Sequence, residues 1–246
     1  MLNACMIWRA LLLVYPSIDL RGAEAPLGRT RFRHRLSEAE VDAALASFLE
    51  FPGLVSDYTE GRATIDHVVK HIDRPLQSLT PMGDGMYWPS PDDTRPELAQ
   101  FSPAGTYDSL FVFWPQRNLE TGKSIPTGGW GLAIAASNWS NGATYAAIAN
   151  IEIPIWRTPA VGEVWLHEWL HGACGFFASR GYTMPDGDAD GGDRHGYVQS
   201  PVTGWSDYYR DLMSGRVKEG DRSTGIPLEA WKEGPRDGGN SASSIR

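Results

Sequence analysis

The fold is decided by a segment that reads Val164-Trp165-Leu166-His167-Glu168-Trp169-Leu170-His171. It lies in a run from 160 to 173 that is apolar on most sides and follows Pro159. Proline is common at the first position of a helix, and a helix that is apolar nearly all round has no face that suits water. We therefore expect a buried helix over 160–173, with the other elements built around it.

Two histidines of this segment, His167 and His171, are four residues apart and so share one face of the helix. Both imidazoles can then bind one Zn²⁺ at about 2.0–2.1 Å. Glu168 follows the first histidine and can take a proton from water that the metal has made more acidic. This is the H-E-x-x-H pattern of zinc metallopeptidases, and it predicts a metal-dependent hydrolase with Glu168 as general base.

Length and composition set bounds on the class of protein. The chain has 246 residues, 41% of them hydrophobic and 21% charged, which fits one large globular domain or two small lobes. The net charge of -8 argues against binding to the phosphates of nucleic acids. Only Cys5 and Cys174 are present, so a disulfide scaffold is excluded. We expect Cys174 to be a buried thiol, because a catalytic zinc keeps its fourth position for water.

The sequence predicts no membrane span, because no stretch reaches the ~20 apolar residues that one needs. Residues 10–15 follow Arg9 and could be the apolar part of a signal peptide, but 11–18 reads equally as a buried strand. We favour the strand, since the cleavage-site pattern is weak. A metallopeptidase of this kind is expected to be secreted or in the cell envelope, and the oligomeric state stays open.

The elements before the helix are mostly strands. Residues 11–18 predict a central strand, and further strands are expected at 63–72, 107–114, 131–137 and 144–153. The capping box Ser37-Glu38-Ala39-Glu40 begins a helix that Pro52-Gly53 should end. Residues 73–106 read as a long loop with a short helix near 97–101. This order predicts an α+β fold in which a mixed sheet lies over the helix.

The chain after residue 175 is rich in loops, with short helical pieces at 208–213 and 227–231. We therefore expect two lobes. Residues 1–175 would form an N-terminal lobe with the sheet and the helix, and 176–246 a smaller lobe that completes the metal site. The polar tail from about 234 should be frayed.

The third zinc ligand is expected in the acidic stretch after the helix, because a catalytic zinc has three protein ligands. The candidates are Asp186, Asp188, Asp190, Asp193 and His195. His195 is the natural nitrogen ligand, and Asp190 is its rival because a carboxylate serves in some zinc sites. The run 186–191 also matches the start of a D-x-D-x-D-G calcium loop, but Tyr197 stands where an EF-hand has glutamate. Another kind of Ca²⁺ loop stays open.

Residues 208–215 form the second informative stretch, and Tyr209 is its candidate catalytic residue. A tyrosine hydroxyl near the metal could stabilise the oxyanion of the tetrahedral intermediate, although ordinary aromatic packing also explains it. Glu163 lies one helical turn before His167, where it could support that histidine or act as a charge at the helix N-terminus. His67 and His71 are also four apart, but in a strand they would lie ~13 Å apart, so we discount them as a metal site.

The segments His167-Glu168-Trp169-Leu170-His171-Gly172 and Asp211-Leu212-Met213-Ser214-Gly215 together resemble the zincin metallopeptidases, and among them the metzincins. The resemblance implies a five-stranded mixed sheet with an antiparallel edge strand above the zinc helix. It also implies that Met213 forms the Met-turn beneath the metal. Metzincins continue H-x-x-G-x-x-H or -D, whereas here the glycine is displaced by one position to Gly175 and Phe177 stands at the ligand position. The third ligand must therefore come after a longer insertion.

A second resemblance concerns that ligand. The stretch from Trp165 to His171, the loop that ends at Gly196-Tyr197 and the aromatic residues from Trp205 look like a group of uncharacterised bacterial zincin-like proteins. In their pattern the expected ligand falls at Asp190, and an aromatic residue is common at the position of His195. This resemblance favours Asp190.

Three functions follow from these features. The leading hypothesis is a zinc-dependent peptidase whose edge strand, 131–137, binds an extended peptide or protein substrate by strand addition. The alternative is a catalytically inactive, zincin-derived binding or structural module, which Ca²⁺ at 186–193 could stabilise. A third is a metal hydrolase that acts on a non-peptide amide or ester.

Overall fold

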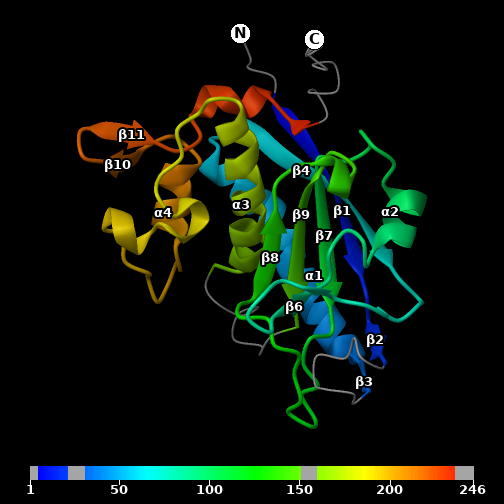
Figure 1. Ribbon diagram of the computed structural model, residues 1–246. Helices are drawn as coiled ribbons and strands as arrows, with labels where there is room; N and C mark the ends of the chain where they lie inside the picture. The colour runs from blue at the N-terminus through cyan, green and yellow to red at the C-terminus, as the bar shows by residue number, and fades with distance from the viewer. Residues whose placement is uncertain (1–4, 22–30, 151–159, 236–246) are drawn as a thin grey trace.

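A computed structural model describes residues 5–21, 31–150 and 160–235. They form a mixed α/β structure around one five-stranded sheet with the order β4-β1-β7-β9-β8 (Figure 1). The strands are β4 Ala63–His71, β1 Met6–Val14, β7 Ser109–Trp114, β9 Thr144–Ala149 and β8 Gly131–Ile134. The first four are parallel, and β8 runs antiparallel to β9 at one edge. The predicted mixed sheet with an antiparallel edge strand is confirmed.

Strand β1 begins earlier than expected and is not central. It covers Met6–Val14 rather than 11–18 and lies second in the sheet, while β7 is in the middle. Ser17 and Ile18 belong to β2 Ser17–Leu20, which pairs with β3 Phe32–Arg35. Pro16 separates the two strands, because proline has no N–H to donate to the sheet.

Both faces of the sheet are covered. Trp8, Ala10 and Leu12 of β1 belong to the core beneath the long helices, whereas Leu11 and Leu13 belong to the core on the opposite face. That alternation follows from the two-residue period of a strand. It also explains why β1 is apolar without interruption from Ala10 to Val14, as is typical of parallel strands that are buried on both faces.

Helix α1, Glu38–Tyr58, lies on the first face and begins at the predicted capping box. Ser37 Oγ accepts from the Glu40 N–H, and the Glu40 carboxylate accepts from the Ser37 N–H at 2.9 Å. The predicted end at Pro52-Gly53 is wrong, because the helix continues through Pro52. Phe51 and Val55, on either side of the proline, are both fully buried, and their packing outweighs the missing backbone hydrogen bond.

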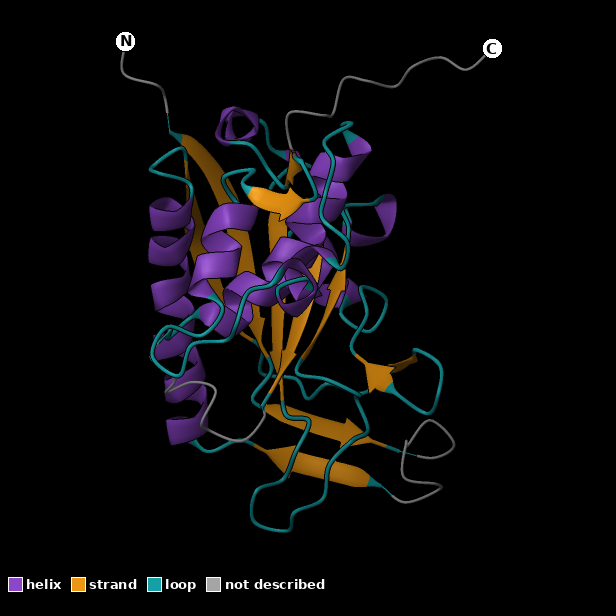
Figure 2. Ribbon diagram, turned by 90° about the vertical axis from the view of Figure 1, so that its left-hand side faces the viewer, coloured by secondary structure: helices purple, strands orange, loops and turns teal. Residues whose placement is uncertain are grey.

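Helix α3, Glu163–Ser179, carries the two histidines and packs against the sheet beside β8 and β9 (Figures 1 and 2). It starts three residues later and ends six residues later than the predicted 160–173, because Phe176 and Phe177 extend its buried side. Helix α3 and the sheet lie very close together. A Cβ on Gly172 would lie 2.8 Å from Thr144 Cβ, and one on Gly175 would lie 3.0 Å from Ala135 Cβ.

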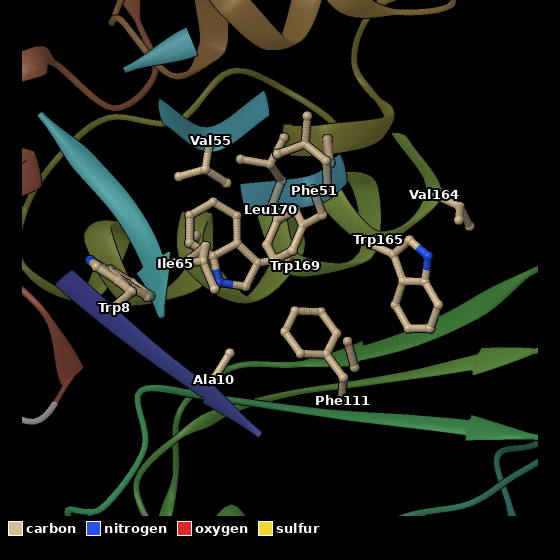
Figure 3. Close-up of a cluster of buried hydrophobic side chains, with 14 of the residues drawn as sticks. Trp8, Ala10, Phe51, Val55, Ile65, Phe111, Val164, Trp165, Trp169 and Leu170 are labelled. Carbon is tan, nitrogen blue, oxygen red and sulfur yellow. The ribbon is translucent and has the colours of Figure 1, made fainter. Parts of the chain in front are cut away.

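The core between α3 and the sheet is aromatic (Figure 3). The ring of Trp169 meets the ring of Trp8 edge-on, with centroids 5.2 Å apart, and lies 5.6 Å from that of Phe51. Trp165 makes a similar edge contact with Phe48 at 5.0 Å. Edge-on pairs of this kind add to the free energy gained from burial alone. The packing of these rings therefore fixes how α3 is rotated about its own axis, and so the direction in which its polar face points.

The remaining elements are short. The segment between β4 and β7 contains β5 Thr80–Pro81, β6 Tyr87–Trp88 and α2 Arg95–Phe101, close to the predicted loop with one helix. The turn between β8 and β9 contains η2 Asn138–Ser140. After α3 come η4 Asp188–Asp190, η5 Asp193–His195, α4 Ser206–Leu212, β10 Val217–Glu219, β11 Arg222–Thr224 and η6 Leu228–Lys232. The pieces predicted at 208–213 and 227–231 therefore correspond to α4 and η6.

The predicted division at residue 175 falls inside α3, and the two-lobe arrangement stays a prediction. Leu212, Met213 and Trp231, from the C-terminal part, lie in the same core as Trp8 and Phe48. The end of the predicted strand at 151–153 and the tail from 236 lie outside the described residues. In the described part of the chain, no helix combines the length and the apolar character that crossing a membrane requires.

Candidate metal centre

Helix α3 directs the two histidines toward one point. His167 Nε2 and His171 Nε2 are 3.3 Å apart, and the two rings stand almost perpendicular at 85°. Two ligands bound to one Zn²⁺ at tetrahedral corners, each at 2.0–2.1 Å, would be about 3.3–3.4 Å apart. The spacing of these nitrogens therefore fits a shared tetrahedral ion.

Asp190, in the 3-10 turn η4, brings the third donor. Its Oδ1 is 3.5 Å from His167 Nε2, and its Oδ2 is 3.7 Å from His171 Nε2. The ligand atoms of His167, His171 and Asp190 all lie within 4.8 Å of one another. Two imidazoles and a carboxylate are a donor set that suits zinc, with a fourth position left for water.

The other nitrogen of each ring has its own partner. His167 Nδ1 is 2.8 Å from the Tyr209 hydroxyl of α4, and His171 Nδ1 is 2.6 Å from Asp188 Oδ1. Such partners fix the orientation and tautomer of a metal-binding imidazole. With Nδ1–H donated to Asp188, His171 keeps the Nε2 lone pair free for a cation.

The turn that carries both aspartates is held by contacts within the C-terminal part of the chain. Asp188 adopts a left-handed backbone with φ 37°, and the Tyr208 hydroxyl donates to its carbonyl. A Cβ on Gly191 would overlap the Asp186 carbonyl and the Tyr208 hydroxyl, so only glycine allows this close approach. The turn is therefore built so that Asp188 reaches Nδ1 of His171 and Asp190 reaches Nε2.

Burial sets the charge of the histidines. It lowers the pKa of His167, and the neighbouring His171 lowers it further. Burial also acts to lower the pKa of His171, but the hydrogen bond with Asp188 and its negative charge outweigh that effect and raise it. Two Nε2 atoms at 3.3 Å cannot both carry protons, so the pair needs either one shared proton or a cation.

Glu168 lies next to the donors but is not one of them. Its Oε1 is 4.0 Å from His167 Nε2, and the residue is only 5% exposed. Burial raises the pKa of Glu168 to about 7; the charge of Asp190 acts in the same direction, and His171 opposes it. A carboxyl group with this pKa can both accept and release a proton near neutral pH.

The donors can be reached from solvent. A cavity of about 470 Å³ opens beside His171, between one face of α3 and the segment from Met184 to Asp190. Cys174, Gly175 and Ala178 line it on the helix side. Cys174 is a buried free thiol, as predicted, and burial raises its pKa well above the usual value. The thiol is therefore held neutral, which suits packing better than metal binding.

The structure does not bring His195 to the other donors. Its Nε2–H donates to the Asp186 carbonyl at 3.0 Å, and its ring stacks on that of Tyr208 with an interplanar angle of 6°. These contacts stabilise the loop and leave the ring turned to the loop's own backbone. Of the two candidates for third ligand, Asp190 alone lies with His167 and His171.

The carboxylates of the predicted calcium run do not converge. Asp186 forms an ion pair with Arg194 at 3.1 Å, while Asp188 accepts from His171 and from the Ala189 N–H. Among the described residues, no second group of three or more His, Cys, Asp or Glu brings its ligand atoms this close. Calcium binding at 186–193 stays a prediction without support from this geometry.

The other residues that the sequence singled out have contacts of their own. The Tyr209 hydroxyl is buried against His167 rather than aimed at the open side of the site, so its contact suits orienting that ring. Glu163 Oε1 accepts from the Trp205 N–H at 3.0 Å, and burial raises its pKa to about 7. Met213 is fully buried, and its carbonyl accepts from Trp231 Nε1 at 2.7 Å. His67 lies on strand β4, as expected, with its ring edge-on to Phe48.

The sequence missed the role of Asp188, which was considered only as a ligand. Its hydrogen bond with His171 joins residues 17 positions apart, and no local pattern predicts it. The sequence nevertheless contained a signal, because Asp188 and Asp190 are two residues apart in one short stretch. One of the two carboxylates can serve as a ligand while the other bonds to the second nitrogen of an imidazole.

No protein-family model matches the chain, and no curated protein matches it. Among solved structures, the chain is similar to the crystal structure of metalloproteinase-II from Bacteroides fragilis, with 11% sequence identity and a TM-score of 0.38. The alignment covers 82% of this chain and 50% of that one, so this chain spans about half the length of that protein. A likeness this distant carries no weight for fold or activity.

Proposed function

We propose that this protein is a zinc-dependent peptidase of the zincin type, with His167, His171 and Asp190 as metal ligands and Glu168 as general base. The observation that carries the proposal is the convergence of three donor groups. The two Nε2 atoms are 3.3 Å apart, and the Asp190 carboxylate approaches them at 3.5 Å through Oδ1 and at 3.7 Å through Oδ2. It is supported by the separate partners of the two Nδ1 atoms, which leave both Nε2 atoms directed at the same point.

The bound metal would polarise the substrate carbonyl and make a water molecule more acidic. Glu168 would take the proton of that water and later give it to the leaving amine. Its raised pKa of about 7 suits both roles, and a nearby cation would lower that pKa toward the proton-accepting form. Burial of the carboxyl group keeps bulk water from competing for the proton.

A peptide is the substrate class that the sheet favours. In the described part of the chain, β8 pairs with β9 alone, so its other edge has N–H and C=O groups for an extended peptide. The strand begins at Gly131, beside Glu168, so a peptide added to β8 would pass close to the metal ligands. This edge favours a peptide over a small amide or ester.

Metal analysis with a cleavage assay tests the proposal. The wild-type protein is expected to bind one Zn²⁺ per chain and to cleave peptides from a mixed library in a chelator-sensitive way. Glu168→Gln should keep the zinc and lose activity by about 10²–10⁴-fold, the typical contribution of general acid–base catalysis. Unchanged cleavage by this variant would refute the base assignment.

Two further variants decide the third ligand. Asp190→Ala should lose zinc under conditions in which the wild type retains it, while His195→Gln should retain it, because His195 contacts the loop backbone. The reverse result would transfer the ligand role to His195. Stoichiometric zinc without cleavage of any peptide would favour the inactive binding module, and calcium in place of zinc would favour the calcium-stabilised one.

A further inference from the structure

The first residue of the edge strand, Gly131, lies directly against the side chain of Glu168. A Cβ atom built on Gly131 would stand closer than 3.0 Å to Glu168 Cδ, Cγ and Oε1, a separation that real Cβ atoms essentially never show. The carboxyl group therefore occupies the space that any side chain at position 131 would need.

The backbone does not require glycine here. Gly131 has no left-handed φ, unlike Gly128 with φ +72°, so an alanine at 131 would be free of backbone strain. The strand is also fixed in place, because Gly131 pairs with Ile148 and the Trp130 carbonyl accepts from the Ala149 N–H at 3.1 Å. The three heavy atoms nearest to a Cβ at 131 all belong to Glu168, so this side chain is the first obstacle that a residue larger than glycine would meet.

Gly172 and Gly175 also lie between α3 and the sheet. Gly131 differs from them in the kind of atom that an added Cβ would displace. A Cβ on Gly172 would meet Thr144, and one on Gly175 would meet Ala135, both close to the backbone of their own segment. Substitution there would push α3 and the sheet apart. At Gly131 the obstacle is one side chain, Glu168 from Cγ onward, and not backbone, so we expect the side chain to move before the strand does.

We propose that Gly131 is a positioning residue for the general base. The missing side chain leaves a recess in the strand in which the Glu168 carboxylate lies beside the metal ligands, 4.0 Å from His167 Nε2. A methyl group at this position would displace the carboxylate without touching the three ligands. This inference rests on the proposed function, since it assigns Gly131 a role through Glu168.

The variant Gly131→Ala tests this inference. We expect zinc content and the midpoint of thermal unfolding to equal those of the wild type, while kcat falls by about 10²-fold, as a 1 Å misplacement of a reacting group can cause. KM should stay within a factor of two or so, because the peptide contacts the strand through its backbone. The matched control is Gly129→Ala, whose added Cβ would have only the Gly131 carbonyl near it, at 4.0 Å. The control should match the wild type in every measurement.

A second substitution separates positioning from structural damage. Glu168→Ala removes Cγ and the carboxyl group, the atoms that the new methyl would meet. On its own, Glu168→Ala should lower kcat. In the Glu168→Ala background, Gly131→Ala should cause no further loss, because the group that it displaces is gone. Independent, additive losses would overturn the proposal.

A crystal structure of Gly131→Ala gives a result that does not depend on cleavage. It should show the Glu168 carboxyl group rotated away from the ligands, with the backbone of β8 unmoved. A carboxyl group in its original place, or a shifted strand, would refute the positioning role even if the wild type cleaves no peptide. If the group moves as expected but the wild type is inactive with zinc bound, the proposed function fails and the steric relation stands.

Discussion

At the scale of single residues, the two histidines differ in the charge of their partners. His171 Nδ1 faces the carboxylate of Asp188 at 2.6 Å, whereas His167 Nδ1 faces the neutral hydroxyl of Tyr209 at 2.8 Å. A carboxylate partner increases the basicity of an imidazole and strengthens its bond to a metal. We therefore expect Asp188 to contribute more to metal affinity than Tyr209.

Asp188→Asn should weaken zinc binding by about 10–100-fold, the usual effect of losing such a partner. Asparagine also tolerates the left-handed backbone at this position, with φ 37°, so the turn should persist and only the charge is lost. Competition with a chromophoric chelator measures the affinity. Asp186→Asn is the control, because that carboxylate is paired with Arg194. Equal zinc affinities for the two variants would show that the Asp188 carboxylate beside the His171 ring has no effect on metal binding.

At the scale of elements, short sequence patterns predicted the helices and strands that neighbouring residues determine. The capping box of α1, the buried helix α3 and the antiparallel edge strand were all expected from residues close together in the sequence or from its resemblance. The end of α1 was missed, since the rule that proline stops a helix ignores the burial of Phe51 and Val55 around Pro52.

The candidate site shows the same limit of sequence reasoning. The pair His167 and His171 was predictable because one helical turn places them together. The contact of Tyr209 with His167 spans 42 residues, and it depends on how α4 packs on α3. Local rules therefore identify the candidate ligands on α3 but not the residues that contact their rings.

An ion pair anchors α2 to the rest of the fold, and its effect on stability should depend on pH. Glu97 of α2 accepts hydrogen bonds from Arg74 and Tyr15. Burial alone would raise the pKa of Glu97, but these bonds outweigh it and hold the pKa below the usual 4.5. Glu97 therefore adds stability that is present above pH 4.5 and is lost as the pH falls through the lower, folded-state pKa.

Arg74→Met should lower the free energy of unfolding by about 2–3 kcal/mol at pH 7, because it leaves a nearly buried carboxylate without its cation. This figure is smaller than for a fully buried pair, since the Arg74 side chain is 32% exposed. The difference from the wild type should shrink as acid protonates Glu97. Urea unfolding at pH 7 and at pH 3–4 measures it, and a difference that grows in acid would contradict the assignment.

At the scale of the whole molecule, one aromatic cluster joins the sheet to the C-terminal part of the chain. Trp231 of η6 stacks on Trp169 of α3 at 5.7 Å and lies 6.1 Å from Trp8 of β1. Its indole N–H donates to the Met213 carbonyl after α4. The proposed metal ligands also join different parts of the chain, because two come from α3 and one from η4. We therefore expect the parts before and after α3 to unfold together.

Denaturant titration should give a single transition for the wild type, by fluorescence and by circular dichroism alike. Zinc at 100 times its dissociation constant should raise the free energy of unfolding by about 2.7 kcal/mol, because it binds the folded chain alone. Trp231→Ala should lower that free energy by about 3–5 kcal/mol and keep one transition. Trp139→Ala is the control, since its side chain lies at the surface, 36% exposed. Two transitions, with zinc shifting only one of them, would show that the C-terminal part is an independent lobe that contributes a ligand without sharing the core.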